Sequence, residues 1–352
     1  MKRVTVFGGG ATGHVVAADL ALRGFEVCLC ENKIYSDSLK GVMQSKEIAI
    51  SGPCINGIGK IHTATTDMKT AIEFAAHIII CTISNRDEEV AELISPFMRD
   101  GQAILLSAGN LGSYIYQRVF AKNGVRGVLV GETCGNLFPS RIIADCKTIT
   151  GLPRSAKPAA AWPTSNTEKL IDAFKDMYEL HCAQSILHCA LDVGNMLSHI
   201  GPVLLNTGAI ENRGDKDYYL FKQGISPSVI RLVDQMWKEK KIVMDALGYS
   251  CSPSVSKLLN AIKDPDNNVF DAFLDLSGPN SIKGRHISED TPILVCLMIS
   301  VAQALGIELP IFKAMVQIAS AINDCDYYSQ GRTLKNLGLG HLRGIAVAEY
   351  FG

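Results

Sequence analysis

The sequence predicts an α/β protein of two domains, a doubly wound sheet at the N-terminus followed by an all-helical domain. In the first half, apolar strand-like runs alternate with helical patterns, and the first such run ends in a glycine-rich turn. In the second half only helical periodicity remains. The 352 residues exceed what one hydrophobic core usually holds, so we predict one domain over residues 1–185 and another over 186–352.

The glycine-rich turn follows the apolar run 4–7 and fits the pattern G-x-G-x-x-G within residues 8–13. In this pattern the first glycine permits a tight turn and the second lets the backbone approach a pyrophosphate. The third packs the next helix against the sheet. The N–H groups at the start of that helix, expected over 11–23, attract phosphates. The turn predicts a Rossmann dinucleotide site with the cofactor-binding residues Gly8, Gly10, Ala11, Thr12 and Gly13.

A second apolar strand, 26–30, ends at Glu31, where a carboxylate can accept hydrogen bonds from the adenosine ribose hydroxyls. The same carboxylate repels the 2′-phosphate of NADPH, so we expect NAD, as NADH, to be the preferred cofactor. Lys33 could compensate for this repulsion, which keeps NADP as the alternative. The competing interpretation of Glu31 is a solvated strand end.

Three further apolar runs, 77–83, 102–107 and 127–131, have the character of buried parallel strands. Loops at the carboxyl ends of such strands form the ligand crevice of an open α/β sheet. The loop after the last run contains Thr133, which we name as a substrate-binding candidate. An ordinary turn is the competing interpretation of this loop.

The segment 191–211 is apolar on most of its surface but carries a polar stripe that begins just before it. At about 100° per residue the stripe falls within an arc of roughly 60° on one helix, which Pro202 must kink or interrupt. A structural histidine with satisfied partners is one interpretation. We favour a catalytic site, because an imidazole titrates near neutral pH and unpartnered buried polar groups cost roughly 1–3 kcal/mol each. The stripe consists of His188, Asp192, Asn195, His199 and Asn206.

Several motifs make the sequence resemble the octopine and opine dehydrogenase family. The resemblance spans nearly the whole chain and includes Gly131-Glu132-Thr133 in the first domain. Its motifs in the second half are far more specific than the glycine turn. They are Asn195-x-x-x-His199-x-x-Pro202-x-x-x-Asn206, Tyr218-Tyr219 with Gly224-Ile225-Ser226-Pro227, Gly278-Pro279 with Arg285-x-x-x-Glu289-Asp290, and Gly331-Arg332-Thr333-Leu334.

The resemblance implies a Rossmann domain joined to a helical domain. It also implies an NAD(P)H-dependent oxidoreductase that condenses an amino acid with an α-keto acid, for which pyruvate is the first guess. Residue by residue, it places the catalytic histidine, arginine and aspartate on His199, Arg285 and Asp290. The histidine would shuttle protons, the aspartate would fix its tautomer, and the arginine would clamp a carboxylate.

Simpler interpretations exist for the charged residues of the second half. Asp290 could merely complement the dipole of the helix that begins at Thr291-Pro292, and Arg285 could be a surface cation. Arg332 is a second carboxylate-binding candidate, with a structural salt bridge as its alternative. Together with Thr133, the substrate-binding candidates are Asn195, Asn206 and Arg332.

Charge, apolar runs and cysteine spacing indicate which partners the protein has and in which compartment it lies. The formal net charge is −1 without a long basic run, which argues against nucleic acid as the main partner. The longest apolar run, 293–307, is shorter than the ~20 residues that span a bilayer, so no membrane partner is expected. The 11 cysteines are scattered without metal-ligand spacing. We expect a cytoplasmic protein that needs no metal, binds small molecules, and has a homodimer as the assembly to test.

Two other functions compete with the opine-type reaction. A reductase of a simple 2-keto acid or of ketopantoate would use the same platform, but it needs a positioned lysine as proton donor. No lysine lies on the polar stripe. A non-catalytic NAD(P)-binding sensor would be expected to lack one of His199, Arg285 and Asp290, and all three are present. Dependence of NADH oxidation on an added amine separates these functions.

Overall fold

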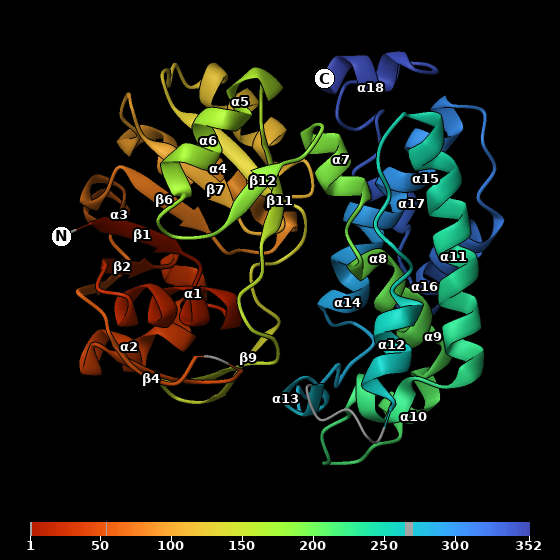
Figure 1. Ribbon diagram of the computed structural model, residues 1–352, viewed down its shortest axis with the longest axis horizontal. Coiled ribbons are helices and arrows are strands. Elements are labelled where there is room, and N and C mark those ends of the chain that lie inside the picture. The colour runs from red at the N-terminus through yellow and green to blue at the C-terminus, as the bar shows by residue number, and fades with distance from the viewer. Residues whose placement is uncertain (1, 54, 265–269) are drawn as a thin grey trace. The chain divides into compact units, whose positions relative to one another are not determined.

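The structure is a computed structural model that describes residues 2–53, 55–264 and 270–352. The chain divides into two compact units, Met1–Cys189 and Ala190–Gly352, which run from red to green and from green to blue in Figure 1. The division lies within α7, Ile186–Leu191, whereas we predicted a boundary after residue 185. The first unit is α/β and the second helical, which confirms the predicted fold class.

An eight-stranded sheet forms the N-terminal unit, in the order β12-β11-β8-β7-β6-β1-β2-β5. All neighbouring strands from β5 to β8 run parallel, and β1 lies between β2 and β6. The strand order therefore reverses beside β1, at the switch point where doubly wound folds bind their ligands. The strands are β1 Arg3–Phe7, β2 Glu26–Cys30, β5 Thr63–Thr65, β6 His77–Ile80, β7 Ala103–Leu106, β8 Leu129–Thr133, β11 Lys157–Ala161 and β12 Leu180–Cys182.

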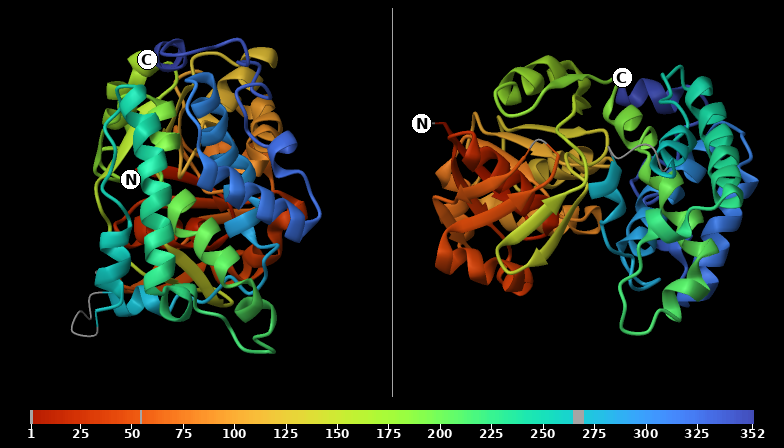
Figure 2. Two further views of the ribbon diagram at one scale, coloured as in Figure 1. Left: turned by 90° about the vertical axis from the view of Figure 1, so that its right-hand side faces the viewer. Right: turned by 60° about the horizontal axis from the view of Figure 1, so that its bottom comes forward.

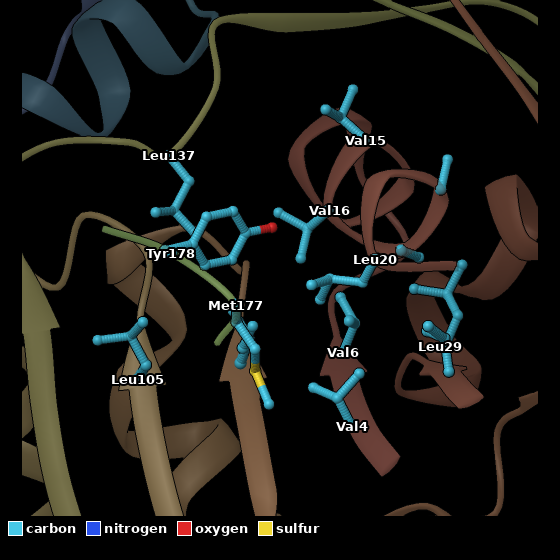
Figure 3. Close-up of a cluster of buried hydrophobic side chains, with 14 of the residues drawn as sticks. Val4, Val6, Val15, Val16, Leu20, Leu29, Leu105, Leu137, Met177 and Tyr178 are labelled. Carbon is cyan, nitrogen blue, oxygen red and sulfur yellow. The ribbon is translucent and has the colours of Figure 1, made fainter. Parts of the chain in front are cut away.

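Apolar side chains cover both faces of this sheet. Val4 and Val6 of β1 belong to one core cluster and Phe7 to another, because successive side chains of a strand point to opposite faces. Figure 3 shows the first cluster, in which Val16 and Leu20 of α1 lie beside β1. Burial on both faces explains why these strands are continuous apolar runs. The helices are α1 Ala11–Leu22, α2 Lys40–Ser45, α3 Met68–Phe74, α4 Asp87–Ile94, α5 Gly112–Lys122 and α6 Thr167–Phe174, with short 3-10 turns η1 Lys33–Leu39, η2 Ser84–Arg86, η3 Ser95–Phe97 and η4 Thr164–Asn166.

A second sheet, in the order β4-β3-β10-β9, was not indicated by the sequence pattern. It joins β3 (Glu47–Ser51) and β4 (Gly57–Lys60) to β9 (Ser140–Ala144) and β10 (Lys147–Thr150) through a parallel β3–β10 pair. α1 packs so closely on β4 that a Cβ at Gly59 would lie 2.8 Å from the backbone of Ala18. Short strands with many exposed side chains carry little apolar periodicity, which is why the pattern missed them.

Helices make up the described part of the C-terminal unit, apart from one bridge between Tyr219 and Gly278. The longest of them is α11 (Pro227–Ala246), the long blue-green helix in Figure 2. It contacts α9 (Ile200–Leu205), α12, α15 (Cys296–Ala304) and α16. It begins where Ser226 Oγ accepts a hydrogen bond from the N–H of Val229 and Pro227 occupies the first helical position. The other elements are α12 Ser256–Ile262, α13 Asp271–Leu274, α14 Arg285–Ser288, α16 Pro310–Asn323, α17 Tyr327–Gln330, α18 Ala346–Phe351 and the π-helical turn η5 Leu220–Gly224.

The segment 191–211 is not one continuous helix. It forms α8 (Asn195–Ser198), α9 (Ile200–Leu205) and α10 (Thr207–Glu211), which meet at His199 and Asn206. Pro202 explains the first break, because it has no N–H for the carbonyl of Ser198 and its ring crowds that carbonyl. The predicted interruption is confirmed, and the single polar arc drawn for a continuous helix is wrong.

The predicted helix over 291–305 begins with a π-helical turn, η7 (Thr291–Val295), and continues as α15 (Cys296–Ala304). By length and composition the stretch Arg285–Ala304 could cross a membrane. However, 78% of its most apolar window is buried inside the unit, as in the core helix of a soluble protein. Its apolar character therefore serves the packing of the helical unit.

Candidate active site

The turn between β1 and α1 requires glycine at two positions. Gly8 has a φ of +129°, and a Cβ there would lie 2.9 Å from the backbone of Cys81. A Cβ at Gly13 would lie 1.8 Å from the carbonyl oxygen of Gly8. At Gly10 the opposite holds, because no atom lies within 4 Å of where a Cβ would be. The backbone at Gly10 therefore borders open space that a pyrophosphate could approach.

The N-terminus of α1 suits an anion. Gly10 is its N-cap and offers no side-chain hydrogen bond, and the first turn contains no acidic residue. The first N–H groups and the positive end of the helix dipole are thus available to phosphate oxygens. The residues of the turn fit the pyrophosphate of a dinucleotide. The individual roles of Ala11 and Thr12 stay predictions.

His14 is a residue of this turn that the sequence pattern did not single out. Its ring is fully buried, and Nδ1 lies 3.0 Å from the carbonyl oxygen of Gly10. Burial lowers the pKa of His14 below its usual value, so the imidazole is neutral at pH 7. A neutral Nδ1–H can donate to that carbonyl and thereby hold the backbone of the turn in place.

Glu31, at the end of β2, is only 4% exposed, so a solvated strand end does not describe it. Its Oε2 accepts a hydrogen bond from the N–H of Gly9 at 3.0 Å, and Oε1 accepts one from the N–H of Asn32 at 2.7 Å. The cation against this carboxylate is Arg86, whose two terminal nitrogens lie 3.3 Å from Oε1. Lys33, which the sequence left open as a compensating cation, is exposed at the start of η1. The contact with ribose hydroxyls stays a prediction.

Thr133 ends β8 and is buried. Its hydroxyl accepts a hydrogen bond from the N–H of Ala108 at 3.1 Å and lies 2.8 Å from the carbonyl oxygen of Gly135. The neighbouring Glu132, also buried, accepts hydrogen bonds from the N–H groups of Leu111 and Ser113 at the start of α5. Both side chains therefore fix the loops after β7 and β8. The part of Thr133 in substrate binding stays a prediction.

In the helical unit, His199 and Asp290 form a close buried pair. Nδ1 of His199 lies 2.5 Å from Oδ2 of Asp290, and the two residues are 9% and 4% exposed. The break between α8 and α9 places the histidine, and the residue before η7 supplies the aspartate. When the carboxylate accepts from Nδ1–H, the tautomer is fixed and Nε2 keeps its lone pair for a substrate.

Arg285 and His286 lie at the start of α14, a few residues before Asp290 in the sequence. The Arg285 side chain is 45% exposed and lies 3.8 Å from Glu289, too far for a strong hydrogen bond. Its guanidinium therefore remains accessible to a carboxylate ligand. The ring of His286 stands 4.5 Å from the ring of His199 at 64°, a neighbour that the sequence did not reveal.

The other members of the predicted stripe have separate surroundings. Asp192 binds Nζ of Lys240 at 2.7 Å and the hydroxyl of Ser252 at 2.6 Å. Nδ1 of His188 accepts from the N–H of Gln184 at 3.2 Å, within the N-terminal unit. The amide of Asn206 donates to the carbonyl oxygens of Pro202 and Gly224. Asn195, half-buried, is the first residue of α8. The substrate roles of Asn195 and Asn206 stay predictions.

We expect the Lys240→Met variant to lose about 3–5 kcal/mol of unfolding free energy in urea denaturation. The Asp192–Lys240 pair is buried, with side chains 6% and 2% exposed, so removal of the lysine leaves an uncompensated carboxylate in the core. Lys241→Met is the matched control. Lys241 pairs with Asp245 at the surface, where such a pair contributes about 0.3–0.5 kcal/mol. Equal stability of the two variants would contradict the structural role of the buried pair.

Arg332 follows α17, and its side chain is buried. Its backbone N–H donates to the carbonyl oxygen of Pro292 at 2.7 Å, which ties the C-terminal motif to η7. The contact of Arg332 with a substrate carboxylate stays a prediction.

Among the described residues, no group of three His, Cys, Asp or Glu side chains is arranged to hold a metal ion.

Comparison with known proteins places these features in a family context. The model of the NAD/NADP octopine/nopaline dehydrogenase alpha-helical domain matches residues 182–323. An opine dehydrogenase of Arthrobacter sp. (strain 1C) is 25% identical to the chain, over 98% of each sequence. The matched region contains His199, Arg285 and Asp290.

Solved structures share the two-unit fold. Octopine dehydrogenase with NADH and pyruvate aligns with a TM-score of 0.72 at 16% identity, over 96% of each chain. Yersinopine dehydrogenase with bound NADP+ aligns with a TM-score of 0.69 at 12% identity, over 99% of each chain. A ketopantoate reductase of the PanE/ApbA family from Ralstonia eutropha JMP134 aligns with a TM-score of 0.63 at 16% identity, over 92% of this chain and 98% of that one. These identities establish a common fold only.

Proposed function

We propose that this chain, which belongs to the octopine and opine dehydrogenase family, joins the amine of an amino acid to an α-keto acid and reduces the resulting imine. The enzyme is an NAD(P)-dependent oxidoreductase that acts on a CH–NH bond. The observation that carries the proposal is the His199–Asp290 pair, which lies in the region that matches the family's helical domain. Pyruvate is the first keto acid to test, because octopine dehydrogenase was solved with NADH and pyruvate.

The nicotinamide cofactor supplies the hydride that converts the imine carbon to a secondary amine. The residues that would hold it are those of the turn 8–13, with the start of α1 facing the phosphates and Glu31 facing the adenosine ribose. Open space at Gly10 and the uncapped helix start are the features that fit it.

His199 would move the protons of the condensation. Because Asp290 holds Nδ1, Nε2 is the nitrogen that takes a proton from the substrate amine as it attacks the keto carbon. Nε2–H then gives this proton to the former keto oxygen, which becomes the hydroxyl of the adduct. A second transfer through Nε2 moves the remaining amine proton to that hydroxyl, which leaves as water as the C=N bond forms. Asp290 stabilises the cationic imidazole between these two transfers.

Arg285 would bind the carboxylate of the keto acid. A guanidinium offers two parallel N–H donors to a carboxylate, and this one is half exposed and only loosely paired with Glu289. The carboxylate of the amino acid needs a second cation, for which Arg332 remains the candidate.

We further propose a cytoplasmic location, because none of the described cysteines forms a disulfide. A homodimer can be tested by light scattering.

The Asp290→Asn variant should lower kcat by about a hundredfold or more. An amide can donate to Nδ1 and so move the ring proton to Nε2, where the mechanism needs a lone pair. The dissociation constant for NADH, followed by its fluorescence, should stay the same. Asp324→Asn is the matched control, because Asp324 is exposed and has the left-handed backbone that asparagine tolerates. A normal kcat for Asp290→Asn would remove the aspartate from the mechanism.

The direct test of the proposed function is the oxidation of NADH and NADPH, followed at 340 nm, with pyruvate in the presence and absence of the twenty amino acids. Oxidation that appears only with amines supports the proposal, and division of the amino-acid pool then names the substrate. Oxidation with pyruvate alone would make the protein a keto-acid reductase. Cofactor binding without turnover over a broad panel of amines and keto acids would indicate a sensor.

The structure bears on the reductase alternative through Lys240. This lysine approaches the predicted stripe from α11, but its Nζ is held 2.7 Å from Asp192 and the residue is 1% exposed. A lysine that donates a proton to a substrate must reach that substrate. The likeness to ketopantoate reductase therefore extends to the fold, while the exposed cation near the His199–Asp290 pair is Arg285, whose side chain is 45% exposed.

A further inference from the structure

Arg86 connects the two loops that flank the glycine turn. It ends η2, which follows β6, and its guanidinium lies 3.7 Å from the ring centre of Tyr35 in η1, which follows β2. It also bonds to Glu89 at 2.9 Å and to Glu31 at 3.3 Å. Because β2 and β6 both run parallel to β1, these groups gather at the same edge of the sheet as the glycine turn.

The bonding of Glu31 limits what it can offer a ribose. Oε1 already accepts from the N–H of Asn32 and faces both terminal nitrogens of Arg86, whereas Oε2 accepts from the N–H of Gly9 in the glycine turn. Each carboxylate oxygen has about two acceptor sites. Glu31 therefore lies between Arg86 and the glycine turn, and Oε2, which accepts from Gly9, keeps an acceptor site for a ribose hydroxyl.

The bond between Arg86 and Glu31 is a weak one for a charged pair. Its length of 3.3 Å exceeds the roughly 2.7–2.9 Å typical of strong charge-assisted bonds. The side chain is 12% exposed, so it lies at the edge of the site rather than deep in the core. A guanidinium in this state can exchange a carboxylate for a phosphate with little loss, and it suits the bidentate recognition of phosphate.

We propose that Arg86 determines how the protein discriminates between NADH and NADPH. With NADH it positions Glu31 for the 2′-hydroxyl, and with NADPH it neutralises Glu31 and binds the 2′-phosphate. This proposal rests on the cofactor site of the proposed function. It assigns to a residue on the loop after β6 a task that the sequence pattern gave to Glu31 and Lys33.

The test is fluorescence titration of the full-length protein with NADH and with NADPH, for the wild type, Arg86→Met and Arg99→Met. Arg99→Met is the matched control, since Arg99 forms an exposed pair with Glu73 before β7. In Arg86→Met we expect NADPH to bind about tenfold or more weaker, because Glu31 then repels the phosphate without compensation. NADH should weaken by about threefold or less, and the control should match the wild type.

Salt gives a second readout. In the wild type the dissociation constant for NADPH should rise more steeply with ionic strength than that for NADH, and in Arg86→Met this difference should disappear. Glu31→Gln, which keeps Arg86, should bind NADPH more tightly and NADH more weakly than the wild type. If the melting curve of Arg86→Met shows that this variant does not fold, the affinities of Glu31→Gln test the proposal instead.

Two outcomes would overturn the proposal for Arg86. One is an unchanged ratio of the NADH and NADPH affinities in folded Arg86→Met, and an equal loss of both would mean a purely structural role. The other is a Glu31→Gln variant that binds NADPH no better than the wild type. Failure of the wild type to bind either dinucleotide would instead contradict the cofactor site, so the two failures are distinct.

Discussion

The His199→Ala variant is expected to lose about a thousandfold in kcat while its affinity for NADH changes by less than twofold. In the proposed mechanism the imidazole moves protons at Nε2, while its Nδ1 lies 2.5 Å from Oδ2 of Asp290. The turn proposed to bind the cofactor lies in the N-terminal unit, so loss of the ring should not disturb it. Steady-state rates at saturating substrates and fluorescence titration with NADH measure the two quantities.

His341→Ala is the control for this variant, because His341 is an exposed histidine of the same unit. A near-normal rate for His199→Ala would exclude the histidine from catalysis. Partial activity has a specific explanation, since the ring of His286 stands 4.5 Å from that of His199 and could relay protons in its absence. The double variant His199→Ala/His286→Ala should then remove the remaining activity.

The Arg285→Met variant should raise the KM for pyruvate by about 10- to 100-fold, with smaller changes in kcat and in the KM for the amino acid. The keto acid would lose a bidentate, charge-assisted contact, whereas methionine keeps most of the length of the side chain. Arg285→Lys should recover only part of the affinity, because an ammonium keeps the charge but not the planar fork. Initial rates with each substrate varied at saturation of the others measure these constants.

Arg231→Met serves as the control, since Arg231 is exposed on α11 and bonds to Ser228. A raised KM for the amino acid alone would reassign Arg285 to the other carboxylate. Unchanged constants for both substrates would shift the carboxylate site to Arg332, the buried arginine after α17. Each outcome therefore indicates which substrate carboxylate, if any, Arg285 binds.

The sequence predicted the parallel sheet well because its strands are buried on both faces and leave continuous apolar runs, as in β6 and β7. The small sheet of β3, β4, β9 and β10 escaped prediction for the opposite reason. Its strands alternate or are largely exposed, and its two halves are brought together by a pairing between residues about a hundred positions apart, such as Ala49 with Lys147. No local pattern records such a pairing.

Prediction of the site shows the same limit. His199 was found through local polarity, but its 2.5 Å bond to Asp290 joins residues 91 positions apart and could be expected only from the family resemblance. Asp192 was placed on the same polar stripe as His199 of a continuous helix, whereas the structure pairs it with Lys240 of α11. Arg86 likewise meets Glu31 across 55 positions. Local periodicity identifies which residues are polar and buried, while the tertiary fold decides which of them meet.

The π-helical turn Thr291–Val295 lies between the segment that carries Arg285 and Asp290 and the buried helix α15. It therefore determines how far that segment is rotated about the helix axis relative to α15. A π turn holds about one residue more than an α turn, and each residue advances a helix by about 100°. Removal of one residue between 291 and 295 would regularise the helix and rotate the preceding segment by that angle about the axis. Asp290 would then turn away from His199, although no residue of the site had been substituted. The site therefore depends on the length of this turn as much as on its residues, and we expect relatives with the same site to preserve that length.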